Sequence, residues 1–240
     1  MQHVANFILG SAVIDGWDAL RETPTLVREE FVEAFNTNQK AFDLDLPTRT
    51  IERLADYYEL IQHHNEFLHL VGPCSPEEFA IRHILESLTL LEYLPHGSKF
   101  ADVGTGAGLP SIPCLIVRED LKAILIESKE KKSKFLDIAV KHLGINNRSR
   151  IVNQQFQKVD PADCNVVTCR ALDKFTERLP LLIKWTMRRR MLLFGGWNLR
   201  EALKAQKIGF AEKLMPLSKQ RFLYAANFKI RYKRIDKERA

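Results

Sequence analysis

The most informative part of this chain is residues 100–110, Phe100-Ala101-Asp102-Val103-Gly104-Thr105-Gly106-Ala107-Gly108-Leu109-Pro110. An apolar run leads directly into three glycines at alternate positions. Glycine permits positive φ and lets a ligand approach the backbone closely. A second apolar run, 123–127, ends in the carboxylate of Glu127, 25 residues after Asp102. This pairing predicts a nucleotide-like cofactor bound across the carboxyl edge of a parallel sheet.

Strands and helices alternate on both sides of this stretch. We predict strands at 99–103, 122–127, 150–154, 165–169 and 190–194, and helices at 109–118, 129–143 and 174–189. Such alternation indicates an α/β fold, a mostly parallel, doubly wound sheet. Beyond it we predict a helix at 198–208 and strands at 221–226 and 228–233, the last two forming a hairpin that closes one sheet edge.

The sequence before residue 96 predicts helices. Ile51, Leu54, Tyr58 and Ile61 form one apolar stripe at helical spacing. Ser75-Pro76-Glu77-Glu78 has the N-cap, first-turn proline and capping-box glutamate that begin a helix, which we expect to reach about Leu94. We therefore divide the chain into an N-terminal helical extension, 1–95, packed on a cofactor-binding domain, 96–240.

Composition limits the class of protein. The 240 residues are 45% hydrophobic and 28% charged, as in a soluble globular protein, and no run is long and apolar enough for a bilayer. With no basic leader segment at Met1, we expect a cytoplasmic protein. Cysteine and histidine spacing predicts buried reduced thiols and no metal site.

Positive charge gathers near the end of the chain. The net charge is +6, and nine Lys or Arg against two acids fall between Lys213 and Ala240, with a further cluster at Arg188-Arg189-Arg190. This distribution favours a polyanionic partner, and a merely solvated surface is the alternative.

The spacing of the glycines separates two kinds of cofactor. Dinucleotide-binding loops read G-x-G-x-x-G, whereas this loop reads G-x-G-x-G, with Leu109 where the third glycine would stand. It resembles the first motif of S-adenosylmethionine-dependent methyltransferases, a Rossmann-like class I fold. The resemblance implies that Gly104, Thr105 and Gly106 face the amino-acid part of that cofactor, whose carboxylate suits the N-terminus of the following helix.

Two carboxylates flank the loop. Glu127 is placed to accept both ribose hydroxyls, and the alternative is a surface acid among the lysines that follow it. Asp102 ends a buried strand, where its carboxylate accepts hydrogen bonds from loop N–H groups or contacts the cofactor ammonium directly.

The longer stretch Asp102-Val-Gly-Thr-Gly-Ala-Gly-Leu-Pro-Ser-Ile-Pro113 resembles the D-V-G-T-G-x-G-L-P-G-I-P signature of the glucose-inhibited division protein B family, the 16S ribosomal RNA guanine-N7 methyltransferases. Arg82-His83-Ile84-Leu85-Glu86-Ser87 resembles that family's R-H-I-L-D-S. Asn65 stands where the family has an asparagine before its N-L-T, and Val167–Ala171 resembles its I-S-R-A. The resemblance covers about residues 50–196.

The resemblance implies cofactor contacts at Gly104, Leu109, Phe156, Gln157 and Arg170. Phe156 can pack on adenine and Gln157 can bond its edge, whereas an ordinary core aromatic is the alternative for Phe156. For Arg170 the alternative is a salt bridge at the start of a helix. The resemblance also places Arg82 and His83 on the active-site side, where with Arg170 they are candidates for positioning the substrate. A structural role is the alternative for His83.

Four positions depart from the family's pattern. His69-Leu70-Val71 replaces the family's N-L-T, and Gly195 replaces its lysine after the fifth strand. Gln155 replaces an arginine, and Ser111 replaces the glycine after L-P. We expect these positions to face the substrate or to shape the mouth of the pocket.

The resemblance implies methyl transfer from S-adenosylmethionine to guanine N7 in small-subunit ribosomal RNA, naked or in the small ribosomal subunit. N7 carries an in-plane lone pair and needs no deprotonation, so positioning is the main catalytic task, and we predict no general base. Two alternatives stay open: a methyltransferase of the same fold acting on a protein or small molecule, and a non-catalytic RNA-binding relative.

Overall fold

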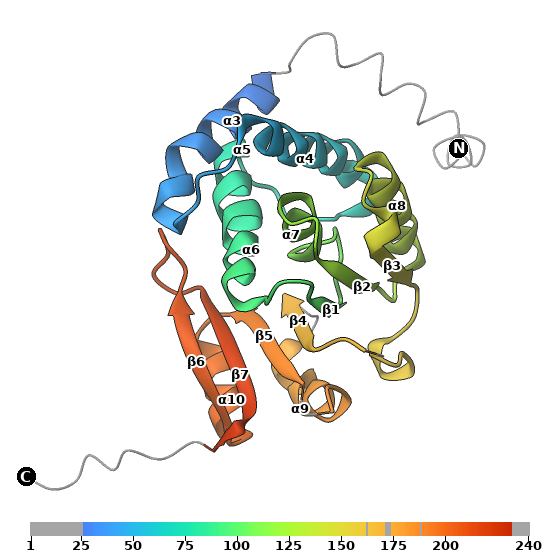
Figure 1. Ribbon diagram of the computed structural model, residues 1–240, viewed down its shortest axis with the longest axis vertical. Helices are drawn as coiled ribbons and strands as arrows, with labels where there is room; N and C mark the ends of the chain where they lie inside the picture. Colours follow the sequence, from blue (N-terminus) through green and yellow to red (C-terminus); the bar gives the residue numbers. More distant parts are fainter. Residues whose placement is uncertain (1–25, 162, 171–173, 188, 232–240) are drawn as a thin grey trace, which may run out of the picture.

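The computed structural model describes residues 26–161, 163–170, 174–187 and 189–231. Within these ranges one seven-stranded sheet runs through the molecule in the order β3-β2-β1-β4-β5-β7-β6 (Figure 1). All pairings are parallel except those that β7 makes with β5 and β6. The strands are β1 Lys99–Val103, β2 Lys122–Ile126, β3 Ser149–Val152, β4 Val166–Arg170, β5 Arg190–Gly195, β6 Ile208–Leu214 and β7 Phe222–Arg231. The predicted mostly parallel sheet is confirmed.

The helices between the strands also follow the predicted alternation. They are α7 Ser111–Val117, α8 Glu130–His142, α9 Phe175–Trp185 and α10 Trp197–Ala205. Short 3₁₀ turns lie at η2 Gln39–Phe42, η5 Asn146–Arg148 and η6 Phe156–Lys158. Gly144, at φ +65°, follows the end of α8 and donates its N–H to Lys141 O, which ends the helix in the left-handed conformation that glycine favours.

The predicted hairpin at 221–226 and 228–233 is wrong. Residues 222–231 form the single strand β7, and its hairpin partner is β6, Ile208–Leu214, in a stretch for which we predicted no strand. Residues 232 and 233 lie outside the described residues. The segment 208–214 alternates poorly between apolar and polar residues, and it becomes a strand because the edge of β7 is available to pair with it.

The N-terminal helices are α3 Leu26–Asn38, α4 Thr48–Leu68 and a continuous helical segment from Pro76 to Tyr93. That segment comprises α5 Pro76–Glu78, a π-helical stretch η3 Phe79–Leu85, α6 Glu86–Leu88 and a 3₁₀ turn η4 Thr89–Tyr93. The predicted capping box is present, since Glu78 N–H donates to Ser75 Oγ and Ser75 N–H to the Glu78 carboxylate. The Glu86 N–H donates to Ile81 O, five residues back, so the helix is widened where Arg82 and His83 lie.

Successive side chains of each strand point to opposite faces of the sheet, so the buried residues form two hydrophobic cores. Phe100, Ala123 and Leu125 pack with α3, α4, the 76–93 helical segment, α7 and α8. Ala101, Val103 and the facing residues of their neighbouring strands pack instead with α9 and α10. The sheet is therefore covered on both faces, and the N-terminal helices share a core with it. The division of the chain at residue 95 stays a prediction.

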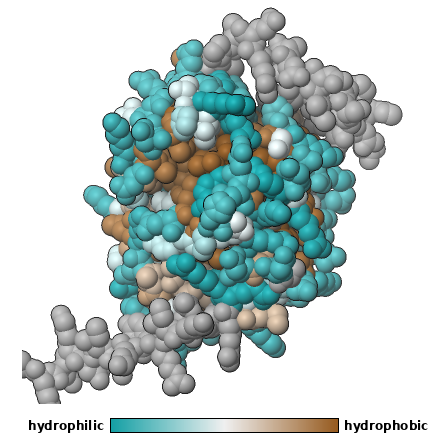
Figure 2. Space-filling model, viewed as in Figure 1, coloured by the Kyte–Doolittle hydropathy of each residue, from teal (hydrophilic) through white to brown (hydrophobic). Residues whose placement is uncertain are grey.

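In the middle of the face drawn in Figure 2, hydrophobic residues are visible between hydrophilic ones. No described helix is long and apolar enough to cross a membrane. In the same ranges no three His, Cys, Asp or Glu side chains gather as metal ligands. Cys74 is partly exposed, whereas Cys114, Cys164 and Cys169 are buried.

Candidate functional site

The glycine loop leaves β1 at the centre of the carboxyl edge of the sheet. Gly104, Gly106 and Gly108 have φ values of +68°, +59° and +98°, which side chains adopt rarely. A Cβ atom on Gly108 would lie 2.3 Å from Ile112 Cδ1, so close packing requires a glycine there as well. The N–H groups of Gly104 and Thr105 donate to Ile126 O, which attaches the loop to the end of β2.

Asp102 lies beneath this loop and is completely buried. The hydroxyls of Thr105 and Ser111 donate to its Oδ2 at 2.7 and 2.6 Å. Desolvation raises its pKa to about 7, although these hydrogen bonds oppose the shift. Oδ1 has no partner among the described residues, which leaves a buried acceptor unsatisfied at the loop. A cationic group bound at the loop would stabilise the ionised form of Asp102.

Glu127 follows β2 and is only 6% exposed, so the alternative of a surface acid is wrong. Its Oε2 accepts from Gly106 N–H at 3.0 Å, and its Oε1 from Lys129 N–H at 2.8 Å. The side chain thereby joins the glycine loop to the second strand. A carboxylate has about four lone-pair positions, so both oxygens can accept further bonds. Ribose binding by Glu127 stays a prediction.

The loop has a support that sequence reasoning missed. Tyr57, buried on α4, donates its hydroxyl to Ala107 O at 2.7 Å. Burial raises its pKa well above the ordinary value, and the nearby Asp102 carboxylate adds to the shift, so the hydroxyl stays a donor. Tyr57 lies beside the apolar stripe of α4 and not in it, and no pattern in the sequence marks a residue whose hydroxyl reaches across to the loop.

Leu109, Phe156 and Gln157 were predicted to contact the cofactor. Leu109 is buried in the core below the loop. Phe156, on the 3₁₀ turn after β3, is 4% exposed and packs edge-on against Trp185 with ring centroids 5.5 Å apart. The structure thus shows Phe156 in a core role, whereas Gln157 beside it is exposed. Contact of these three residues with the cofactor stays a prediction.

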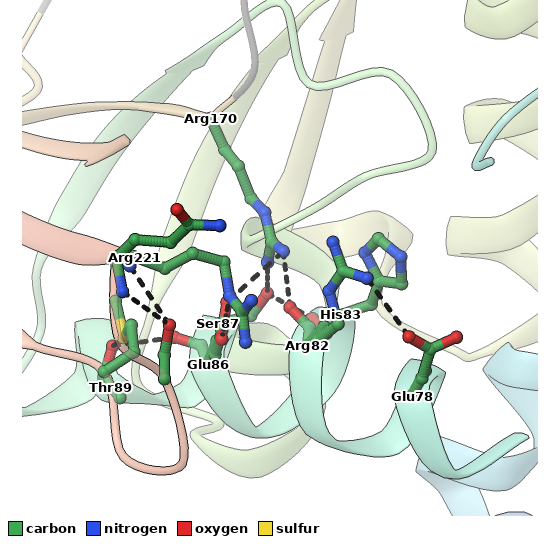
Figure 3. A network of polar contacts seen from close by, with 11 residues as sticks. Glu78, Arg82, His83, Glu86, Ser87, Thr89, Arg170 and Arg221 are labelled. Carbon is green, nitrogen blue, oxygen red and sulfur yellow. Dashed lines mark hydrogen bonds and ion pairs between the residues drawn. The ribbon is translucent and has the colours of Figure 1, made fainter. Parts of the chain in front are cut away.

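Three predicted site residues, Arg82, His83 and Arg170, lie together at the end of β4, the strand that pairs with β1. Figure 3 shows Arg170 reaching from β4 to the helix that carries the other two. Its guanidinium donates to Ser87 Oγ at 3.0 Å and to Arg82 O, and it lies 3.8 Å from Glu86 Oε2. Arg170 thus forms an ion pair with Glu86 of the 76–93 helical segment, as the salt-bridge alternative expects, and its contact with the cofactor stays a prediction.

Glu86 is the buried acid of this cluster, with a side chain 3% exposed. Arg221, from the turn between β6 and β7, donates Nε–H to Glu86 Oε1 at 2.6 Å. Burial raises the pKa of Glu86, and the hydrogen bond from Arg221 and the charge of Arg170 counteract that shift. Burial next to three arginines lowers the pKa of His83 to about 3, so its imidazole is neutral. The Nδ1 atom of His83 is buried without a hydrogen-bond partner in the described part of the chain.

A cavity of about 660 Å³ opens beside this cluster, and we call it the arginine pocket. It is lined by the 82–86 helix turn, the ends of β4 and β5, the start of α10 and the β6–β7 turn. Val103 is the register partner of Cys169, so Gly104 and Arg170 are the next residues on adjacent strands. The glycine loop and the arginine pocket, which Arg170 helps to line, therefore lie at the same edge of the sheet.

The four positions that depart from the family's pattern lie in different parts of the fold. Gly195 lines the arginine pocket, and a Cβ atom there would lie 2.6 Å from Leu199 Cδ2. Ser111 is buried against Asp102, so the expectation that it faces the substrate is wrong. His69 ends α4 at φ +46°, a conformation that asparagine tolerates well. Gln155 is exposed next to the η6 turn.

Two arginines of the cluster at 188–190 have a structural role. Arg189 donates to Cys164 O and Arg190 to Tyr93 O, while Arg188 lies outside the described residues. Those two side chains hold β5 to neighbouring segments. The positive charge at the candidate site comes instead from Arg82, Arg170 and Arg221.

The family model for GidB, rRNA small subunit methyltransferase G, matches residues 50–223. This match spans the glycine loop, the 76–93 helical segment and the arginine pocket. The chain belongs to this family. This chain is 34% identical over 158 residues to the ribosomal RNA small subunit methyltransferase G of Sorangium cellulosum, covering 63% of this chain and 66% of that protein. It is 32% identical over 174 residues to the protein of the same name from Rickettsia felis, covering 72% of this chain and 88% of that one.

Solved structures of other methyltransferases share the fold of this chain. Magnesium protoporphyrin IX methyltransferase from Synechocystis, solved with bound SAM, superposes with a TM-score of 0.52 at 17% identity, covering 76% of this chain and 98% of that one. The M. capricolum TrmK structure with S-adenosyl-homocysteine gives 0.51 at 12% identity, covering 63% and 71%. The predicted family and the predicted Rossmann-like methyltransferase fold are confirmed.

Proposed function

We propose that this chain transfers a methyl group from S-adenosylmethionine to N7 of a guanine in 16S ribosomal RNA. The observation that carries the proposal is the juxtaposition, at one sheet edge, of a glycine loop above a buried unsatisfied carboxylate and a cavity bearing three arginines. The curated GidB relatives are named for methylation of the small-subunit RNA, which supports the choice of substrate. That substrate agrees with the predicted cytoplasmic location.

The residues around the glycine loop fit the cofactor. Gly104 and Gly106 give a backbone that a ligand can approach closely, and Glu127 supplies acceptors for ribose hydroxyls. Asp102 supplies a buried carboxylate that a cationic amino group would stabilise, through direct contact or through the loop. When bound, the cofactor supplies an electrophilic methyl group on a sulfonium.

The chain's own groups would act on the guanine by positioning. Guanine N7 presents its lone pair at the base edge and loses no proton before attack. The neutral His83 and the paired Glu86 are therefore not needed as bases, and the arginines orient the RNA. Proximity and alignment of this kind supply a large part of a barrier reduction, on the order of 7–11 kcal/mol in well-oriented systems.

The test is incubation of the protein with labelled S-adenosylmethionine and small-subunit RNA that lacks the modification, followed by mapping of the labelled base. We expect label at N7 of one guanine. Naked RNA and assembled small subunits are compared as substrates in parallel. Label in a protein or small molecule instead of RNA would favour the alternative substrates, and binding of RNA with no label at all would favour the non-catalytic relative.

A further inference from the structure

The arginine pocket contains features that neither the cofactor nor the glycine loop explains. Its volume of about 660 Å³ falls in the range of small-molecule sites and is ample for one nucleotide. Its lining combines aromatic residues with Arg82, Arg170 and Arg221. Aromatic faces stack bases and arginines bind phosphates, so this composition is typical of a site for a nucleotide.

Among the aromatic residues, Trp197 is the most accessible. It begins α10 and is 48% exposed, whereas Phe194 and Phe222 are each 6% exposed. The guanidinium of Arg170 already lies over the Phe194 ring, 5.7 Å from its centroid. Trp197 contacts Phe222 in a T-shaped arrangement, with ring centroids 4.7 Å apart, and the Arg200 guanidinium lies over the indole, 5.3 Å from its centroid. An indole that is fixed in place and still half exposed is suited to stack on a base.

The three arginines of the pocket also differ in how exposed their side chains are. Arg170, with a side chain 14% exposed, is engaged with Ser87, Glu86 and the Arg82 carbonyl, so it is part of the wall. The side chains of Arg82 and Arg221 are 46% and 32% exposed and remain accessible to a phosphate. Among the described residues that line the pocket, Glu86 is the one acid, and its charge is shared by Arg170 and Arg221. The pocket therefore carries excess positive charge at its surface.

We propose that the arginine pocket receives the target nucleotide after it has left the RNA stack, with Trp197 stacking on the base and Arg82 and Arg221 binding its phosphate. This inference rests on the proposed function. Enzymes that modify bases extract the target nucleotide into a pocket, and this pocket lies at the same edge of the sheet as the glycine loop. The base edge also offers a partner to the unsatisfied Nδ1 of His83.

The first experiment is single-turnover methylation of small-subunit RNA by Trp197→Ala, Trp197→Phe and the control Phe67→Ala. Phe67 is 61% exposed on α4, outside the pocket. Because the base loses its stacking partner, Trp197→Ala should lower the rate by roughly five- to 150-fold. Trp197→Phe should restore most of that loss, and Phe67→Ala should match the wild type. Calorimetry should show unchanged affinity for S-adenosylmethionine in all three.

The outcomes separate the inference from the proposed function. If the wild type labels the RNA and Trp197→Ala does so at the same rate, the pocket assignment is overturned while the function stands. If cofactor affinity falls together with the rate, Trp197 acts through the fold and the assignment is also overturned. If the wild type labels no RNA, both proposals fail.

A second variant decides the matter should Trp197→Ala fail to fold. Arg82→Gln removes an exposed cation whose ion pair with Glu78 contributes little to stability. A lost phosphate contact reduces the slope of log affinity for RNA against log salt by about one. Arg49→Gln, which removes an equal charge from an exposed position on α4, should leave the slope unchanged. Equal slopes for Arg82→Gln and the wild type would overturn the phosphate assignment.

Discussion

At the scale of single residues, the glycine loop is defined by backbone conformation. Gly104 has φ +68° and its N–H bonds to Ile126 O at 2.9 Å, so the chain turns sharply directly after β1. A β-branched residue is strongly disfavoured at such a φ. The position is thus constrained by geometry before any ligand binds.

We predict that Gly104→Val abolishes binding of S-adenosylmethionine, because the turn below the cofactor is distorted. Calorimetry measures the affinity and circular dichroism checks the fold. Gly72→Val is the matched control, since Gly72 lacks a positive φ and a Cβ atom there meets nothing within 4 Å. Wild-type affinity in Gly104→Val would show that the loop has been assigned the wrong role.

Asp102 makes stability depend on pH in a specific direction. Its pKa rises from the ordinary 3.8 to about 7 in the folded protein, so the folded state holds a proton that the unfolded state has lost. Its contribution to stability is therefore complete below about pH 4 and is lost as the pH rises through about 7.

We predict that Asp102→Asn removes this dependence. The free energy of unfolding of the wild type, relative to Asp102→Asn, should fall between about pH 4 and pH 7 with a slope of up to about 1.4 kcal/mol per pH unit. Urea denaturation across that range measures it. The comparison cancels the opposite effect of His83, whose pKa is lowered and which both proteins retain. A flat difference would mean that Asp102 is ionised throughout.

At the scale of elements, α4 supports the loop from outside the cofactor-binding strands. Tyr57 contacts the loop through a single hydrogen bond to Ala107 O, and the same helix packs on α7 and α8. The position of the loop therefore depends on a helix that precedes it by some fifty residues in sequence.

We predict that Tyr57→Phe destabilises the protein by about 1 kcal/mol and weakens cofactor binding, because the buried Ala107 carbonyl loses its donor. Denaturation and calorimetry measure the two effects. Tyr58→Phe is the matched control on the same helix: the described structure shows no hydrogen bond from the Tyr58 hydroxyl. Equal effects of the two substitutions would contradict a specific role for the Tyr57 hydroxyl.

At the scale of the whole molecule, the N-terminal helices and the sheet have a common interior. The face of the sheet that includes Phe100 and Leu125 belongs to the same core as Phe31, Tyr58 and Phe79. Phe31 stacks on Tyr58 with ring centroids 4.7 Å apart, which joins α3 to α4. Removing these helices would expose to water the apolar residues of this core that α7 and α8 do not cover.

We therefore predict that a chain restricted to residues 96–240 does not fold on its own. Near-ultraviolet circular dichroism and thermal denaturation, with the full chain as reference, test this. A cooperative transition together with binding of S-adenosylmethionine by the shortened chain would establish 96–240 as an independent domain and contradict the prediction.

The sequence by itself determined the features that depend on local chemistry. The order of strands and helices from β1 to α10, the capping box at Ser75 and the left-handed glycines follow from neighbouring residues, because propensity, capping and positive φ are local properties. The grouping of Asp102, Gly104 and Glu127 also follows, since parallel strands bring their carboxyl ends to one edge.

Features that depend on contacts between distant segments could be found only in the three-dimensional structure. The strand β6 exists because β7 offers an edge to pair with, and Ser111 turned out to be a buried donor to Asp102. The arginine pocket joins Arg82, Arg170, Trp197 and Arg221, which come from four separate segments. No local pattern encodes such a meeting, because side-chain neighbours across a core are set by packing, not by spacing along the chain.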